Sequence, residues 1–164
     1  MERDATHLPD PDDTAGGDVV RSVDLDCDAD RAWALVATED GLGRWLGGDV
    51  RLDPTVGGAL GVRDDDGTVR VGRVLAAEEG RSLTFEWAPV GDRAARTTVT
   101  LTVEGPDPDG GGPGGTSRVT VVERPAGGAR VAACLDAGAA WDQRLLGLEL
   151  DVLAHGRLAV APAL

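Results

Sequence analysis

The side chains that could carry out acid–base or nucleophilic chemistry are few and widely spaced in this sequence. The two histidines lie near opposite ends, His7 in an acidic N-terminal segment and His155 at the end of a predicted helix. The two cysteines, Cys27 and Cys134, are too far apart for a metal-ligand pair or a dense disulfide framework, so we expect buried free thiols. No Ser–His–Asp, Cys–His, HExxH or phosphate-binding glycine motif can be assembled. We therefore expect no catalytic residues, no metal and no cofactor.

Carboxylates and arginines are the remaining ionisable candidates. Four acids alternate near the end of the first predicted strand and could bind a cation or share a proton, although helix capping and solvated surface explain them more simply. A second run, at 64–67, lacks the alternating ligands and distal glutamate of a calcium loop, so we interpret it as a hairpin turn. The four alternating acids are Asp24, Asp26, Asp28 and Asp30.

Two glutamates and two arginines lie where they could meet a bound molecule. Glu86 and Glu123 are the candidates for acid or base work, but strand alternation places Glu86 on the polar side. Arg118 and Arg144 could bind a ligand carboxylate, or could simply be exposed on the surface.

The five aromatic residues form the most informative group. Trp33, Trp45, Phe85, Trp87 and Trp141 are the only aromatics in 164 residues. For Trp33 we expect packing of a short helix behind a sheet. The other four could line a pocket for a flat or apolar ligand, or could fill an ordinary core. The predicted lining, which includes neighbouring aliphatic positions, is Trp45, Phe85, Trp87, Leu101, Val103, Trp141, Leu145 and Leu148.

Strand-like alternation of apolar and polar residues positions most of these candidates. The clearest case is Leu83, Phe85 and Trp87, which alternate with Ser82, Thr84 and Glu86. A segment of only glycine, proline and aspartate at 105–115 predicts a long hairpin loop between the last two strands. The predicted strands are 19–25, 49–53, 59–63, 68–75, 82–87, 96–104 and 116–123.

Helical periodicity interrupts this alternation in two regions. Residues 28–38 predict a short helix capped by Asp28, and residues 39–46 predict a second one. From 136 to 155, Trp141, Leu145, Leu148 and Val152 recur on one face, with Asp136 as the expected cap. We therefore expect an α+β fold, in which a curved antiparallel sheet of six or seven strands holds a long C-terminal helix on its concave face.

Composition limits the classes of function. The formal net charge is −13, with 29 acidic residues against 16 arginines and no lysine, which disfavours nucleic acid and anionic membrane surfaces as partners. No apolar run is long enough to span a membrane, and the N-terminus is acidic, so we expect a cytoplasmic protein with no membrane span. We expect a disordered acidic tail at 1–18, one domain at 19–156 and a C-terminal tail at 157–164.

The order of these segments resembles the START-like helix-grip superfamily (SRPBCC), and in particular bacterial relatives of the activator of heat shock protein 90 ATPase. The resemblance covers 19–156 and rests on the segments DADRAWAL at 28–35, LGRWL at 42–46, DPTVGG at 53–58, RVLAAEEGRSLTFEW at 73–87, the strand ending at Glu123, and WDQRLLGL at 141–148. The short aliphatic segment 59–62 departs from the aromatic-containing strand usual in that family.

The resemblance implies a helix-grip fold and leaves three functions open. The first is binding of a small hydrophobic molecule in a cavity between the sheet and the C-terminal helix. The second is an interaction protein that resembles the chaperone ATPase activator. The third is an enzyme similar to polyketide cyclases, which would need an ionisable group pointing into the cavity.

Overall fold

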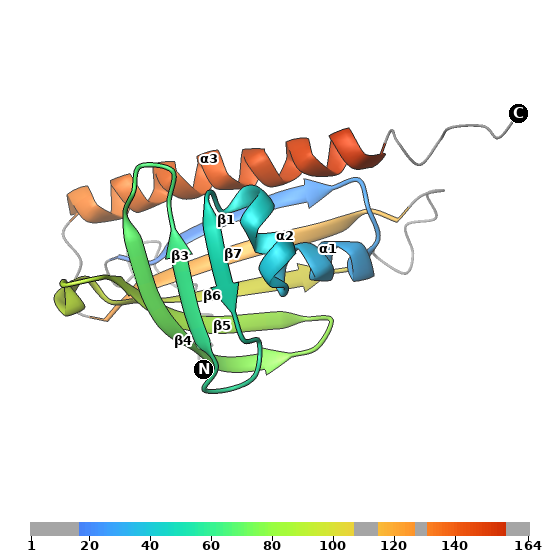
Figure 1. The fold of residues 1–164 in the computed structure, drawn as a ribbon. Helices are drawn as coiled ribbons and strands as arrows, with labels where there is room; N and C mark the ends of the chain where they lie inside the picture. Colours follow the sequence, from blue (N-terminus) through green and yellow to red (C-terminus); the bar gives the residue numbers. More distant parts are fainter. Residues whose placement is uncertain (1–16, 107–114, 127–130, 157–164) are drawn as a thin grey trace, which may run out of the picture.

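A computed structural model of the chain describes residues 17–106, 115–126 and 131–156, with side chains from Asp136 onward in the last range. Within these ranges it contains seven strands, two short helices, a 3-10 turn and one long helix (Figure 1). Most of the two predicted tails and of the predicted loop at 105–115 lies outside the described residues. The elements are β1 (Val19–Leu25), α1 (Ala29–Val36), α2 (Glu39–Trp45), β2 (Asp49–Leu52), β3 (Ala59–Arg63), β4 (Val69–Glu78), β5 (Ser82–Pro89), η1 (Arg93–Ala95), β6 (Thr97–Glu104), β7 (Ser117–Pro125) and α3 (Val131–Gly156).

The seven strands form one antiparallel sheet in the order β1-β7-β6-β5-β4-β3-β2. Consecutive strands from β2 to β7 pair with each other, while β1 adds to β7 at the far edge. The alternation of apolar and polar residues along a strand decides which side chains face the core. In β5, Leu83, Phe85 and Trp87 are buried and the residues between them are half-buried. The predicted sheet is therefore confirmed, and its seven strands lie within the expected six or seven.

The short helices begin where the capping residues predict. Asp28 accepts a hydrogen bond from the Arg31 backbone N–H at 2.8 Å and caps α1. Thr38 caps α2 in the same way through the Gly41 N–H. Helix α1 contacts β6 and β7, whereas α2 contacts β2 and α3.

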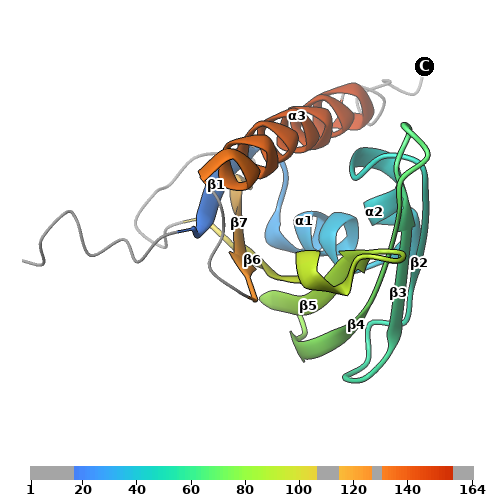
Figure 2. The ribbon, with the colours of Figure 1, turned by 90° about the vertical axis from the view of Figure 1, so that its left-hand side faces the viewer.

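Helix α3 lies across the open side of the curved sheet (Figure 2) and buries Trp141, Leu145, Leu148 and Val152. This is the helix-grip architecture that the sequence predicts. The predicted start at Asp136 is wrong, because α3 already begins at Val131. Ala132 and Ala133 are strong helix formers, so the helix extends a further turn before the expected cap.

One continuous core joins the sheet to all three helices, and the buried residues of α1, α2, α3 and every strand contribute to it. Its largest fully buried side chains include Trp141, Phe85, Leu25 and Leu42. Trp33 is only partly buried and packs against this core from α1.

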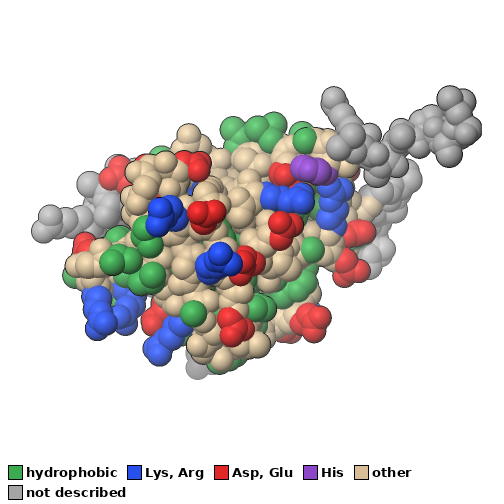
Figure 3. Space-filling view, viewed as in Figure 1, with side chains coloured by type: hydrophobic (Ala, Val, Ile, Leu, Met, Phe, Trp, Pro, Cys, Tyr) green, Lys and Arg blue, Asp and Glu red, His purple; other side chains and the backbone are tan. Residues whose placement is uncertain are grey.

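The exposed surface is mixed in charge. On the face shown in Figure 3, arginines lie beside acidic side chains and do not form one basic patch. Among the described residues, no helix combines the length and the apolar character that crossing a membrane requires.

Candidate functional site

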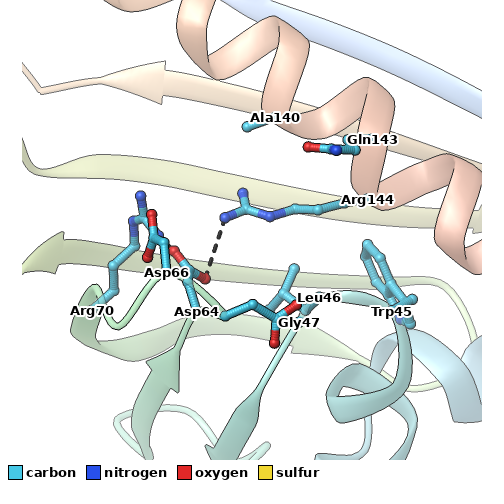
Figure 4. A pocket seen from close by; sticks show the side chains of 10 residues that line it. Trp45, Leu46, Gly47, Asp64, Asp66, Arg70, Ala140, Gln143 and Arg144 are labelled. Atoms are coloured by element: carbon cyan, nitrogen blue, oxygen red, sulfur yellow. Dashed lines mark hydrogen bonds and ion pairs between the residues drawn. The ribbon is translucent and has the colours of Figure 1, made fainter.

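A pocket of about 490 Å³ opens between α3, the end of α2 and the turn that joins β3 to β4. Ala140, Gln143 and Arg144 line it from α3, and Trp45 and Leu46 line it from the end of α2 (Figure 4). The β3–β4 turn contributes Asp64, Asp65 and Asp66, with Gly47 and Arg70 beside it. The pocket therefore combines an aromatic and aliphatic side with a strongly charged side.

Two arginines lie on a pair of stacked indoles at this pocket. The Trp87 and Trp141 ring centroids are 6.1 Å apart with an interplanar angle of 23°. The Arg144 guanidinium carbon lies 5.0 Å from the Trp141 centroid and 5.5 Å from that of Trp87, and the Arg70 carbon lies 5.2 Å from Trp87. Cations over indole faces are attracted by the negative potential of the ring, so the rings help to fix both guanidinium groups.

Both arginines contact the same carboxylate. Arg70 donates to Asp64 through Nη1, and Arg144 Nη2 lies 3.4 Å from the other Asp64 oxygen, as the dashed line in Figure 4 marks. The side chains of Arg144 and Asp64 are only 14% and 13% exposed, so these charges are largely shielded from water. The turn that carries Asp64 is closed by a Gly67 N–H bond to the Asp64 carbonyl, with Gly67 at φ +87°.

Burial and charge shift the pKa values of these groups. Burial lowers the pKa of Arg144, while Glu123 and Asp66 oppose that shift. Burial also lowers the pKa of Arg70, and repulsion from Arg144 lowers it further. The site thus holds two like charges that disfavour each other, beside the carboxylates of Asp64, Asp65 and Asp66 that line the same pocket.

The buried carboxylate of Glu123 holds both indoles in place through hydrogen bonds. Glu123 accepts hydrogen bonds from Trp141 Nε1 at 2.5 Å, Trp87 Nε1 at 3.2 Å and Thr97 Oγ1 at 2.5 Å. It is one of two buried polar residues among those described. Glu123 shares a face of β7 with Val119 and Val121, and that strand alternation could have placed it inside from the sequence.

The structure places all eight residues of the predicted lining in the buried core. Phe85 packs edge-on against Trp87 at 5.4 Å, and Trp45 lies 6.5 Å from Trp141. Trp45 lines the pocket, and Trp87 and Trp141 support the arginine that lines it. Leu101, Val103, Leu145 and Leu148 belong to the same core, and contact of any of the eight with a ligand stays a prediction.

The other ionisable candidates lie elsewhere. Arg118 is exposed and pairs with Asp24 at 2.7 Å, whereas Arg144 lines the pocket. Glu86 is on the face of β5 opposite to Phe85 and Trp87, and it pairs with Arg73 at 2.9 Å.

The described histidine and cysteine side chains, those of His155 and Cys27, also lie outside the pocket lining. His155 lies at the end of α3 beside Asp151, 3.3 Å away. Cys27 is a buried free thiol near Ser117, and the Cys134 side chain is outside the described part of the chain.

Within the described ranges, no three His, Cys, Asp or Glu side chains cluster in a way that could hold a metal ion. The Asp64–Asp66 run instead forms the predicted hairpin turn, in which Asp66 Oδ1 accepts the Thr68 N–H at 2.8 Å. Hydrogen bonds from the backbone and the side chain of Thr68 lower the pKa of Asp66.

Comparison with known proteins identifies a family. The model of the family described as Activator of Hsp90 ATPase homolog 1-like protein matches residues 26–144, in agreement with the resemblance seen in the sequence. None of the curated proteins matches the chain.

Solved structures share the fold at low sequence identity. MLL2253 from Mesorhizobium loti is 23% identical, with a TM-score of 0.69 over 84% of this chain and 97% of that chain. DynU16, of the dynemicin biosynthetic locus, is 22% identical, with a TM-score of 0.67 over 81% of this chain and 46% of that chain. An HSP90 activator from Plasmodium falciparum is 13% identical, with a TM-score of 0.62 over 84% of this chain and 96% of that chain.

Proposed function

This chain belongs to the family of activator of Hsp90 ATPase homolog 1-like proteins, and on that premise we propose that it binds a small, largely apolar molecule between its sheet and its C-terminal helix. The pocket at Trp45 and Arg144 is the proposed site. We also propose a cytoplasmic location, where the buried Cys27 thiol stays reduced.

One observation carries the proposal: the pocket is built from elements that the helix-grip fold brings together, α3 on one side and the α2 end with the β3–β4 turn on the other. Its volume of about 490 Å³ lies within the range of small-molecule sites. Apolar contact is available from Trp45, Leu46 and Ala140, and a few charged groups beside them can orient a ligand.

A pair of tryptophan substitutions on α3 tests this function. Ala140 lines the pocket, whereas its neighbour Ala139 is exposed and does not line it. We expect that a compound from a panel of lipids and aromatic metabolites changes the intrinsic tryptophan fluorescence of the wild-type protein. Ala140→Trp should abolish its binding in calorimetry because the indole fills the pocket.

Ala139→Trp is the matched control and should bind with unchanged affinity. Absence of binding by any compound to the folded wild-type protein would count heavily against the proposal. Equal binding by both variants would place the site elsewhere in the molecule.

A second candidate function is binding to a chaperone. The family match and the structural similarity to the Plasmodium HSP90 activator support it. Exposed leucines at 146, 150 and 153 of α3 provide an apolar outer surface. Capture of the host's own heat shock protein 90 homologue, with stimulation of its ATPase, is the expected result, and an unchanged ATPase rate would reject this function.

A third candidate, catalysis resembling that of polyketide cyclases, requires an ionisable group facing inward, and Glu123 is such a group. Both of its oxygens already accept hydrogen bonds from protein side chains, which favours a structural role over proton transfer. We therefore rank catalysis behind binding.

A further inference from the structure

We propose that the pocket selects ligands that carry a carboxylate on an apolar ring, and that Arg144 and Arg70 bind this carboxylate in competition with Asp64. The inference rests on the proposed binding function and names its ligand class.

The first argument is the supply of hydrogen-bond donors. A guanidinium group carries five N–H donors. Among the described residues, Arg144 and Arg70 each use one hydrogen-bonding nitrogen on Asp64. The remaining donors are available where both arginines line the pocket, and a planar carboxylate matches the geometry of a guanidinium group.

The second argument is charge. Two guanidinium groups that repel each other both hydrogen-bond to one carboxylate, that of Asp64. Asp65 and Asp66 also line the pocket and Asp66 attracts Arg144, but among the described residues neither of them hydrogen-bonds to an arginine. The carboxylate of Glu123 is occupied by two indoles and a threonine. An entering carboxylate would relieve that repulsion. Asp64 lies on a turn whose backbone hydrogen bonds do not depend on its side chain, so its carboxylate can be displaced while the turn persists.

The third argument is the position of the apolar surface. Trp45, Leu46 and Ala140 line the same pocket as Arg144, and Figure 4 shows the Arg144 side chain reaching from α3 toward Asp64 between Ala140 and Trp45. A ligand with its carboxylate on the arginines can therefore place a ring against this surface.

Three naphthalene derivatives of similar size but different charge provide the test by isothermal titration calorimetry. We expect the wild-type protein to bind 1-naphthoate about tenfold more tightly than neutral 1-naphthylmethanol, and cationic 1-naphthylmethylamine most weakly. Arg144→Gln and Arg70→Gln should each remove most of the preference for the acid. Arg118→Gln, which removes an exposed arginine paired with Asp24, should leave it unchanged.

Asp64→Asn should change the affinity for the acid in the direction opposite to the arginine variants. Asparagine suits the turn and removes the competing charge, so 1-naphthoate should bind several-fold more tightly. The matched variant Asp24→Asn should have no effect, since Asp24 and Arg118 are exposed and neither lines the pocket. Should Arg144→Gln fail to fold, Arg70→Gln and Asp64→Asn decide the question.

The outcomes separate the two proposals. Equal affinity for the acid and the alcohol, preference for the amine, or weaker binding of the acid by Asp64→Asn would overturn the carboxylate inference while the binding function stands. Binding of none of the three derivatives overturns the inference as well. The binding function itself falls only if the wider panel of compounds also fails.

Discussion

Glu123 connects three parts of the molecule through a single carboxylate. It lies on β7 and accepts hydrogen bonds from Trp87 on β5, Thr97 on β6 and Trp141 on α3. Such a group is costly to bury unless its oxygens are satisfied, and here both are. The rings that support Arg144 and Arg70 are therefore positioned by a group that does not line the pocket itself.

Replacing this carboxylate with an amide should destabilise the fold. In Glu123→Gln, an NH2 group faces an indole N–H or the threonine hydroxyl, and we expect a loss of about 1–3 kcal/mol in the free energy of unfolding. Urea denaturation followed by circular dichroism measures it. Glu104→Gln, at an exposed position on β6, should change stability by less than about 0.5 kcal/mol. Equal effects would show that the Glu123 contacts add little.

Cys27 should make stability depend on alkaline pH. Burial raises the pKa of its thiol above the ordinary value, so the folded state favours the protonated form. This contribution is complete below the thiol pKa of the unfolded chain and is lost as the pH rises from about 8.5 toward the folded pKa. Unfolding free energies measured between pH 8 and 10 should fall more steeply for wild type than for Cys27→Ala. Parallel curves would contradict the prediction.

At the scale of elements, α1 and α2 pack closely because position 41 is a glycine, which has no side chain. A Cβ on Gly41 would lie 2.2 Å from the Ala34 carbonyl oxygen and 2.6 Å from the Leu35 Cα, both backbone atoms. Gly43, in the same helix, has only the Gly48 oxygen nearby, at 3.9 Å. The two glycines therefore provide a matched pair of positions.

Alanine at these two positions should have opposite effects. Gly41→Ala should cost about 1–3 kcal/mol because the two helices must separate. Gly43→Ala should stabilise α2 by up to about 1 kcal/mol, since alanine favours helix. Thermal unfolding of both variants measures the difference. A stabilised Gly41→Ala variant would mean that α1 shifts at little cost.

Local sequence patterns were sufficient for most elements but not for the pocket. Alternation located the strands, and Asp28 marked the start of α1, because both signals act within a few residues. The pocket brings Asp64 of a turn to Arg144 of a helix across 80 positions. Arg118 and Arg144 were equivalent candidates in the sequence, and only tertiary packing distinguishes the exposed one from the one in the pocket.

At the scale of the whole molecule, the excess of acidic charge should oppose folding. With a net charge of −13, repulsion among carboxylates destabilises the compact state at neutral pH. We expect the melting temperature to rise as NaCl increases from about 10 to 300 mM, over which the screening length falls severalfold. Differential scanning calorimetry measures this, with sucrose as a non-ionic control. A falling melting temperature would show that the surface ion pairs outweigh the repulsion.

The pairing of β1 with β7 affects when the sheet can form during synthesis of the chain. Ser22 on the first strand meets Thr120 on the last, 98 positions later. During synthesis from the N-terminus, β1 therefore leaves the ribosome long before its partner strand β7 exists. Because such distant contacts must wait for the intervening chain, we expect sheet closure to come late and folding to be slow for a domain of this size. Until then, the strand edge that β7 will cover is open to other chains, and a nascent-chain chaperone would have the most effect in that interval.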